Sequence, residues 1–274
     1  MQRDSIANTF VVAVSLCVVC AVLVSSAAVG LRQRQDVNKK LDQQKNILLA
    51  AGLIEGKPDA KEISDTYKNR VEPIIINLET GAQVEGDIAK FDALKAAKSG
   101  DDQQRKVLTD DPAGIKVREN DEIIYRIKDD SGETQQYVFP IRGYGLWSTL
   151  YGYIALDADM ETVNGISYYD HKETPGLGGE VDNPDWKARW RGKKIYDLDA
   201  FSELLNSGSD TETDVENPVD LKVVKGIAMT DHEIDGLSGA SITSKGVENM
   251  ITFWFGPQGY LPFIQSVAKK STGA

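Results

Sequence analysis

Cysteine and histidine are scarce in this chain, and their scarcity excludes several kinds of site. Both cysteines, Cys17 and Cys20, lie in an apolar segment near the N-terminus, so the rest of the chain can form neither a disulfide framework nor a thiolate metal site. The two histidines, His171 and His232, would need carboxylates beside them to hold a metal, and we predict no metal site. They also supply few bases for a hydrolase, and no nucleophile-elbow motif is present.

Basic residues are outnumbered as well. The chain has 31 lysines and arginines against 42 aspartates and glutamates, which gives a formal net charge of −11. Binding to nucleic acid requires a dense basic surface, so we expect no nucleic-acid partner. The glycine-rich segment 173–179 (ETPGLGG) lacks the G-x-G-x-x-G spacing, and no Walker lysine follows it. The sequence therefore excludes a Rossmann or P-loop nucleotide-binding site.

One long stretch of the chain has no charge at all. Between Asp4 and Arg32 every residue is uncharged, and residues 9–30 would span roughly 33 Å as a helix, enough to cross the hydrocarbon core of a membrane. A cleaved signal peptide is the alternative, because residues 25–28 are small. The apolar run is longer than a usual signal h-region, however, and only Arg3 precedes it. We therefore predict an uncleaved, single-pass membrane anchor.

The charges that flank the anchor bear on its orientation. Four basic residues follow it closely while one precedes it, so the positive-inside rule would keep the large domain in the cytoplasm. That rule is weak for long domains, which cross a membrane despite flanking charge. The charges by themselves leave the side of the membrane open.

The pattern of the remaining chain predicts an α+β domain. Alternating apolar residues bounded by turn signals indicate antiparallel strands, with a hairpin around the turn at 129–132. The expected strands are 71–78, 123–127, 136–139, 150–156, 163–169 and 223–224. Helices are expected at 33–53, with a break at Gly52, and at 59–70. Residues 84–120 are expected to be mixed helix and loop, and 206–219 an acidic loop.

These elements suggest three parts of the chain. We expect a transmembrane anchor at 1–34, a membrane-proximal helical or mixed region at 35–120, and a ligand-binding α+β domain at 121–274. Trp186 and Trp190 are expected to form a packing face on a helix, because a W-x-x-x-W pattern is more often core than ligand site.

The most distinctive stretch is hydroxyl-rich and runs from Asp235 to Val247. Apolar residues at i, i+3, i+4 and i+7 follow it and predict one face of an amphipathic helix: Val247, Met250, Ile251 and Trp254. The start of such a helix presents unpaired N–H groups that suit a phosphate, and a hydroxyl there could form an ester. The alternative is an ordinary Ser/Thr-rich N-cap. The hydroxyl residues concerned are Ser238, Ser241, Thr243 and Ser244.

Several motifs in one order resemble a known family, the C-type subunit of the bacterial sodium-translocating NADH:quinone oxidoreductase. The resemblance runs nearly end to end and includes the single anchor. Its motifs are GLWS at 145–148, ETPGLGGEV at 173–181 with the following Asn183, Pro184 and Trp186, LKVVKG at 221–226 and DGLSGASITSKGV at 235–247. The G-type subunit of the Rnf-type ferredoxin oxidoreductase is a more distant relative.

The resemblance implies a covalent FMN. In this family the flavin phosphate is esterified to a hydroxyl in a [ST]-G-A-[TS] motif by a separate flavin transferase. Here the motif reads Ser238, Gly239, Ala240 and Ser241, which implies Ser241 as the acceptor. Members usually have Thr at that position, and Thr243, two residues further on, is an alternative acceptor.

The resemblance also implies roles for residues around the acceptor. Asp235 matches the start of the motif that the transferase recognises, and Lys245 could neutralise the phosphate or be a solvated helix residue. Trp147 would flank the isoalloxazine or belong to the core. The segment from Glu173 to Gly178 is similar to the family segment that wraps the flavin, with Thr174, Gly176 and Leu177 beside it.

The function implied is electron transfer by a tethered FMN within a six-subunit complex of the cell inner membrane. That complex couples NADH oxidation and quinone reduction to sodium translocation, and this chain would supply no catalytic side chain of its own. The family places the domain on the periplasmic side, opposite to the positive-inside rule, and we follow the family. Two alternatives stay open: a flavoprotein like the G-type subunit of an Rnf-type complex, and a membrane-anchored structural subunit without flavin.

Overall fold

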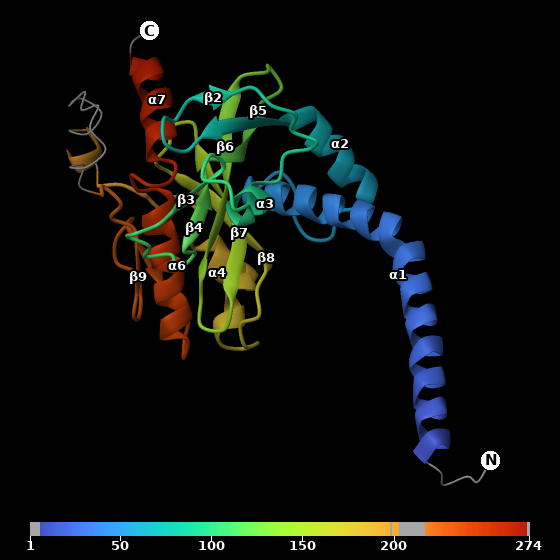
Figure 1. Ribbon diagram of the computed structural model, residues 1–274. Helices are drawn as coiled ribbons and strands as arrows, with labels where there is room; N and C mark the ends of the chain where they lie inside the picture. The colour runs from blue at the N-terminus through green and yellow to red at the C-terminus, as the bar shows by residue number, and fades with distance from the viewer. Residues whose placement is uncertain (1–5, 198, 203–216, 273–274) are drawn as a thin grey trace. The chain divides into compact units, whose positions relative to one another are not determined.

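The computed structural model describes residues 6–197, 199–202 and 217–272 (Figure 1). The chain divides into two compact units, residues 1–43 and residues 44–274. Most of the acidic loop predicted at 206–219 lies outside the described residues.

A single long helix, α1 (Ile6–Ala50), contains the whole predicted anchor. Its apolar part reaches a mean hydropathy of 2.7, and α1 is the one helix among the described residues that is long and apolar enough to cross a membrane. The helix continues through the polar residues after Arg32 and ends at Ala50. Gly52 follows with φ +66°, a left-handed conformation that glycine adopts readily, so the predicted break at Gly52 is confirmed.

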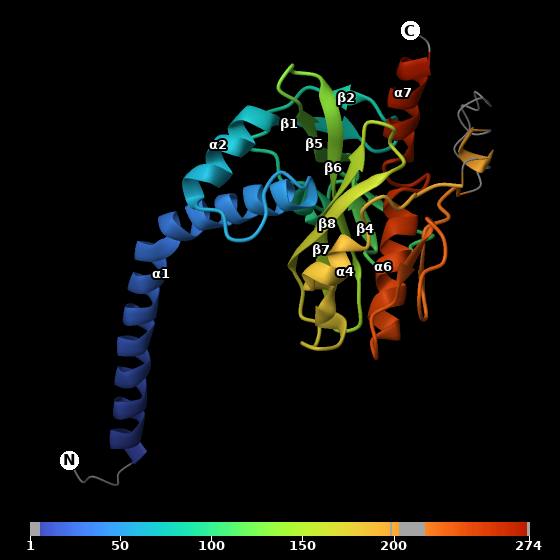
Figure 2. The ribbon, with the colours of Figure 1, turned by 180° about the vertical axis from the view of Figure 1, so that it is seen from behind.

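The second unit is built on a six-stranded antiparallel sheet (Figures 1 and 2). Its strands follow one another in the order β2-β1-β5-β6-β7-β8. Their bounds are β1 Val71–Asn77, β2 Gln83–Val84, β5 Asp121–Lys128, β6 Thr134–Tyr144, β7 Thr149–Asp157 and β8 Val163–Asp170. The strands predicted at 71–78, 123–127, 136–139, 150–156 and 163–169 are confirmed. Because β1 pairs along its whole length with β5, the boundary expected after residue 120 falls between neighbouring strands of one sheet.

Smaller elements complete the unit. They are α2 (Ala60–Arg70), α3 (Ala93–Lys98), β3 (Arg105–Val107), β4 (Val117–Glu119), the 3₁₀ turn η1 (Gly178–Asp182), α4 (Pro184–Ala188), β9 (Lys222–Val224), β10 (Glu233–Asp235), α6 (Ser241–Trp254) and α7 (Leu261–Thr272). The expectation of helix and loop at 84–120 was incomplete, because β3 and β4 pair there as an antiparallel ladder. These two strands are three residues long and carry charged side chains, so they lack the apolar alternation of a longer strand.

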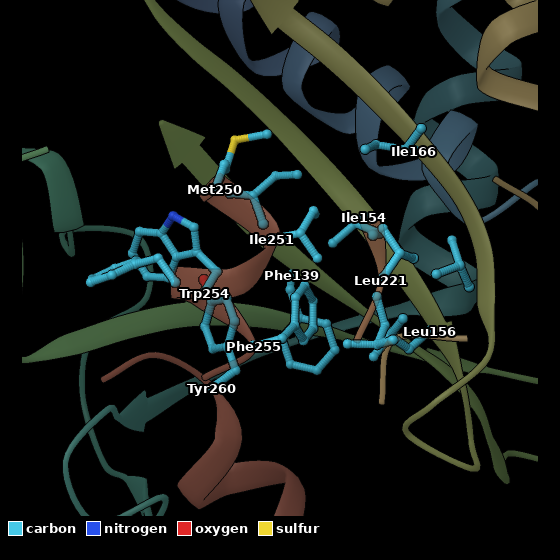
Figure 3. Packing of buried hydrophobic residues seen from close by; sticks show 14 of the residues in the cluster. Phe139, Ile154, Leu156, Ile166, Leu221, Met250, Ile251, Trp254, Phe255 and Tyr260 are labelled. Atoms are coloured by element: carbon cyan, nitrogen blue, oxygen red, sulfur yellow. The ribbon is translucent and has the colours of Figure 1, made fainter. Parts of the chain in front are cut away.

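Helix α6 packs its predicted apolar face onto the sheet (Figure 3). Val247, Met250, Ile251 and Trp254 are all fully buried, which confirms that face. They join Phe139 and other sheet residues in one continuous core. Burying each large apolar side chain contributes about 1.5–3 kcal/mol, so this contact fixes α6 on the sheet. The tryptophans at 186 and 190 are also buried, with ring centroids 5.5 Å apart, so they are core residues as predicted. They do not share one helix face, because α4 ends at Ala188 and Trp190 lies in the turn after it.

The opposite face of the sheet is covered by residues at the end of α1 and by α2. Ile47 and Ala50 pack with Tyr125, Val138 and Tyr153 in a second cluster. Val138 and its neighbour Phe139 belong to different clusters, since successive side chains of a strand point to opposite faces. The sheet is therefore buried on both sides, as the near-continuous apolar runs in its central strands require.

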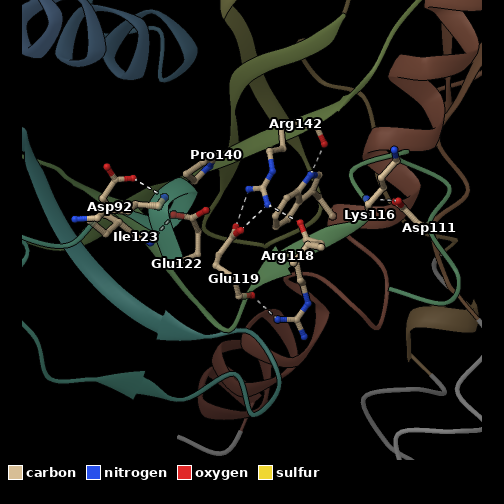
Figure 4. A network of polar contacts seen from close by, with 12 residues as sticks. Asp92, Asp111, Lys116, Arg118, Glu119, Glu122, Ile123, Pro140 and Arg142 are labelled. Atoms are coloured by element: carbon tan, nitrogen blue, oxygen red, sulfur yellow. Dashed lines mark hydrogen bonds and ion pairs between the residues drawn. The ribbon is translucent and has the colours of Figure 1, made fainter. Parts of the chain in front are cut away.

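A buried ion pair joins β6 to the small strand β4 (Figure 4). The Arg142 guanidinium donates to both carboxylate oxygens of Glu119, at 2.8 and 2.5 Å, and lies 5.1 Å from the ring centroid of Trp254. The indole N–H of Trp254 donates to the Arg142 carbonyl at 2.7 Å. These contacts hold β6 against the end of α6, three residues before the chain turns at Gly145.

Candidate functional site

Three segments that are distant in the sequence meet at the carboxylate of Glu173. They are the turn 145–148 between β6 and β7, the loop that follows β8, and the start of α6. One oxygen, Oε1, accepts from the backbone N–H groups of Leu146, Trp147 and Ser148, at 3.1, 2.9 and 3.4 Å. The other, Oε2, accepts from the hydroxyl of Thr243 at 2.7 Å. A single carboxylate thus fixes the turn to the helix.

Close packing around Glu173 explains one glycine of the ETPGLGG segment. A Cβ at Gly178 would lie 2.5 Å from both Glu173 Oε2 and Thr243 Oγ1, so any larger residue would separate these two groups. Gly246 meets a similar limit on α6, since a Cβ there would lie 2.4 Å from the Tyr144 carbonyl oxygen. The absence of side chains at these positions lets α6 approach both loops.

The Glu173 carboxyl is 5% exposed and is held as the carboxylate. Burial raises its pKa, but the hydrogen bonds from Thr243 and from the N–H groups of residues 146–148 outweigh burial and lower the pKa below its usual value. The charge is retained because four donors converge on it.

The start of α6 is not a conventional hydroxyl cap. Ala240 occupies the N-cap position, and no side chain of the described residues caps it. The hydroxyl of Ser244 instead points inward, donating to the Ala240 carbonyl at 3.0 Å and accepting from the Leu237 N–H at 2.9 Å. The first helical bond is Ser244 N–H to Ala240 O, so the N–H groups of residues 241–243 have no partner within the helix. The alternative of an ordinary Ser/Thr N-cap is therefore wrong.

The hydroxyls of the motif lie in two different environments. Ser238 and Ser241 are exposed, and Ser241 is the first residue of α6. Thr243 is fully buried and Ser244 is 5% exposed. Of these four hydroxyls, only those of Ser238 and Ser241 are accessible to another molecule without a rearrangement of the protein.

Large apolar side chains are exposed on the three segments that converge at Glu173. Trp147 is 64% exposed and Leu146 39%, both on the turn that Glu173 holds. Leu177 is 43% exposed on the loop after β8, and Ile242 is 60% exposed beside Ser241. Core packing, one of the two interpretations of Trp147, is excluded by its exposure. Such a group of apolar side chains beside polar donors suits a planar aromatic ligand with an anionic end.

Two other predicted site residues have partners within the protein. The Asp235 carboxylate accepts from the Ala228 N–H at 2.5 Å and pairs with Arg189, while its carbonyl accepts from the indole N–H of Trp186 at 2.8 Å. Asp235 therefore connects β10 to α4. Lys245 pairs with Glu248 one turn along α6.

Thr174 and Gly176 shape the loop after β8. The Thr174 carbonyl accepts from the N–H groups of Leu177 and Gly179, at 3.1 and 2.9 Å, which closes a tight turn. Gly176 has φ +77° at the exposed tip of that turn. The turn places Leu177 at the surface, and its side chain is the nearest contact of a Cβ built at Gly239, at 3.0 Å.

Sequence reasoning missed Leu146, Ile242 and His171. The first two are exposed apolar residues inside the motifs at 145–148 and 235–247, and no periodicity distinguishes them from the rest of those motifs. His171 was considered only as a metal ligand or as the base of a hydrolase, although it lies two residues before Glu173. Among the described residues no group of three or more His, Cys, Asp or Glu side chains is arranged to hold a metal.

Comparisons with known proteins agree with this geometry. The FMN-binding domain family matches residues 145–256, a range that contains all three converging segments. The chain is 42% identical over 270 residues to the C-type subunit of the Na(+)-translocating NADH-quinone reductase of Yersinia pestis, covering 97% of this chain and 94% of that protein. It is also 42% identical over 274 residues to the corresponding subunit of Haemophilus ducreyi, covering 100% of this chain and 98% of the relative.

A solved structure has the same fold. The crystal structure of NqrC from Shewanella oneidensis superimposes with a TM-score of 0.73 at 33% identity, covering 84% of this chain and 98% of that one. The predicted architecture, a long apolar N-terminal helix followed by an antiparallel sheet with helices, is thereby confirmed. The chain belongs to the NqrC family, the C-type subunits of the Na(+)-translocating NADH-quinone reductase.

Proposed function

We propose that this chain is the FMN-carrying electron-transfer subunit of a Na(+)-translocating NADH-quinone reductase, with the FMN joined to Ser241 through a phosphoester. The family membership and the FMN-binding domain at 145–256 support the flavin and the complex. The position of Ser241 supports the covalent linkage.

The observation that carries the proposed linkage is the contrast between the two candidate acceptors. Ser241 is exposed at the first position of α6, beside N–H groups that lack helical partners. Thr243 is fully buried, and its hydroxyl is committed to Glu173 at 2.7 Å. Esterifying Thr243 would require α6 to unwind and would leave Glu173 without that donor. Ser241 needs no such change.

The surrounding residues fit an FMN phosphate and ring. A phosphoester at Ser241 would retain negative charge, which the N–H groups of residues 241–243 and the positive end of the α6 dipole would stabilise. Leu146, Trp147, Leu177 and Ile242 would provide apolar contacts for the ring system, and Glu173 would keep these loops in place. Lys245 would add a positive charge one turn along the helix. Bound FMN supplies the electron transfer, because its ring accepts and releases electrons.

Attachment requires a second protein. The Ser241 hydroxyl would lose its proton, and its oxygen would form a bond to phosphorus in place of the bond to the leaving group of the flavin donor. Among the hydrogen bonds of the described residues, none joins the Ser241 hydroxyl to a general base, so a separate flavin transferase would supply the catalysis. Exposure of Ser238, Gly239 and Ser241 gives such an enzyme access. Asp235, held by its contacts with Arg189 and Ala228, would keep the motif in shape for recognition.

The rest of the proposal concerns the complex. Helix α1 would anchor the protein in the cell inner membrane, in contact with the other subunits of a six-subunit assembly, with the domain on the periplasmic side. The sequence has no dinucleotide fingerprint, so electrons from NADH would arrive through another subunit. Sodium movement would be a property of the assembly.

Mass spectrometry and in-gel fluorescence of the denatured protein test the linkage. The full chain and the variants Ser241→Ala, Thr243→Val and Ser238→Ala would each be purified from the native host. We expect a mass increase of one FMN less one water, and fluorescence that survives denaturation, in every protein except Ser241→Ala. Ser238→Ala removes the other exposed hydroxyl of the motif, so flavin retained in this variant and lost in Ser241→Ala would assign the acceptor to Ser241. Loss of flavin in Thr243→Val alone would move the acceptor, and absence of flavin from all four proteins would favour the structural-subunit alternative.

A further inference from the structure

His171 makes two hydrogen bonds that neither the flavin nor the core accounts for. Its Nδ1 accepts from the backbone N–H of Glu173 at 3.2 Å. Its Nε2 lies 2.9 Å from Asp182 Oδ2. The His171 side chain is 14% exposed, while the Asp182 side chain is 51% exposed. The imidazole therefore bridges a backbone group at the start of the 173–182 segment and a carboxylate at its end.

These two hydrogen bonds determine which tautomer the His171 imidazole adopts. A backbone N–H can only donate, so Nδ1 must offer its lone pair to Glu173. The ring proton then lies on Nε2, where the Asp182 carboxylate accepts it. Each nitrogen therefore has its own partner, and the ring spans the distance between the Glu173 N–H and the Asp182 carboxylate.

The bridged segment contains the residues that line the site. It begins at Glu173, whose carboxylate accepts from four donors, and it includes Leu177, which is exposed and lies next to Gly239. The same segment is anchored from a second side, since Lys172 donates its N–H to the Ser148 hydroxyl at 2.8 Å. The imidazole adds a direct link from this anchored start to the end of η1 at Asp182.

We propose that His171 is a positioning residue that ties the start of the 173–182 segment to its end and so keeps Glu173 and Leu177 in place. Its effect on the flavin rests on the proposed function, whereas its effect on the loop does not. The hydrogen bonds of its imidazole go to Glu173 and Asp182, so His171 acts on Ser241 and Thr243 through the loop.

Two substitutions of His171 each keep one of the two hydrogen bonds of the imidazole and remove the other. In His171→Asn the side-chain oxygen can replace the Nδ1 acceptor, but the donor to Asp182 is lost. In His171→Gln the longer side chain can still donate to Asp182, but the acceptor for the Glu173 N–H is lost. His232→Asn is the matched control, because it changes the other histidine of the chain. Asp182→Asn removes the charge of the partner while keeping its size.

Hydrogen–deuterium exchange of the full chain in detergent is the first measurement, made in the Ser241→Ala background so that no flavin on that residue contributes. We expect both His171 variants to speed exchange of the amides in residues 173–182 by about 2- to 12-fold, the factor that corresponds to one net hydrogen bond. Peptides from β6 and β7 should keep the parent exchange rate, and His232→Asn should change nothing at 173–182. Unchanged exchange in both His171 variants, or equal acceleration throughout the sheet, would overturn the proposal.

Visible circular dichroism of the flavin-bearing chain is the second measurement. With Ser241 intact, we expect His171→Asn and His171→Gln to change the flavin band while the band of His232→Asn matches the parent. Faster exchange with an unchanged flavin band would show that the bridge does not position the site and would overturn that role. If the chain carries no flavin at all, the proposed function fails, and the exchange measurement still decides whether His171 ties the loop.

Discussion

Replacing Thr243 with valine removes a single hydrogen bond from the centre of the site. Valine nearly matches threonine in shape, so the fully buried position stays filled while Glu173 Oε2 loses the donor at 2.7 Å. The carboxylate keeps the three backbone N–H groups on Oε1. The substitution therefore isolates the contact between α6 and the loop after β8.

The expected cost follows from the charge of the acceptor. A hydrogen bond to an ionised group contributes about 1.5–3 kcal/mol, about twice a neutral one. For a unit of this size each kcal/mol lowers Tm by about 2–4 °C, so Thr243→Val should lower Tm by about 3–12 °C. Because the pKa of Glu173 is lowered by folding, its contribution is present at neutral pH and is lost as the pH falls through the folded pKa. Without the Thr243 donor the folded pKa of Glu173 rises towards its unfolded value, so the loss of stability on acidification should be smaller in Thr243→Val than in the parent.

Thermal and urea unfolding of the two proteins between pH 4 and pH 8 would measure both effects. Thr252→Val is the matched control, since the Thr252 hydroxyl lies on the same helix and donates only to the Glu248 carbonyl, at 3.0 Å. We expect that control to lose about 1 kcal/mol or less. If Thr243→Val is as stable as Thr252→Val at neutral pH, the Glu173 carboxylate does not hold α6 to the loop.

Two further predictions concern the buried cluster of β4, β5 and β6. Burial and the neighbouring Glu119 carboxylate raise the pKa of Glu122 well above its usual value. The free energy of unfolding should therefore fall as the pH rises from about 4.5 towards the folded pKa. Urea unfolding measured across this pH range should show a smaller fall in Glu122→Gln. A steeper fall in the variant would contradict this. Arg142→Met leaves the fully buried Glu119 carboxylate without its partner and should lower the free energy of unfolding by about 3–5 kcal/mol. Lys245→Met removes one member of an exposed pair and should change the free energy of unfolding little. Equal losses in the two variants would show that the Arg142–Glu119 pair does not stabilise the fold as a buried ion pair.

Much of the fold could be predicted from local patterns. The long strands alternate in polarity or run apolar between turn residues, and those near residues 71, 123, 150 and 163 were found. The short strands β3, β4 and β10 were missed, because three residues are too few to show a period. Their pairing depends on partners elsewhere in the chain.

The site was predictable in its motifs and not in its contacts. Glu173 was placed near the flavin by resemblance, yet its role as the acceptor for residues 146–148 and for Thr243 depends on segments up to 70 residues away along the chain. The partners of Asp235, on strand β10, could not be predicted either, since Arg189 reaches it from the C-terminal end of α4, 46 residues earlier in the chain. No spacing of residues in the sequence predicts these contacts between distant segments.

Local patterns in the sequence were enough to predict the long apolar N-terminal helix, the antiparallel strands, the apolar face of α6 and the four hydroxyls of the motif. Which of those hydroxyls is exposed depends on how α6 packs. Residues 241 and 243 differ by about 200° around a helix, so they face opposite ways once α6 has formed. Thr243 lies on the same face of α6 as Val247, Met250 and Trp254. That spacing predicts the burial of Thr243 only once the helix is known to begin at Ser241. Packing against the sheet and Glu173 then buries Thr243 and leaves Ser241 exposed.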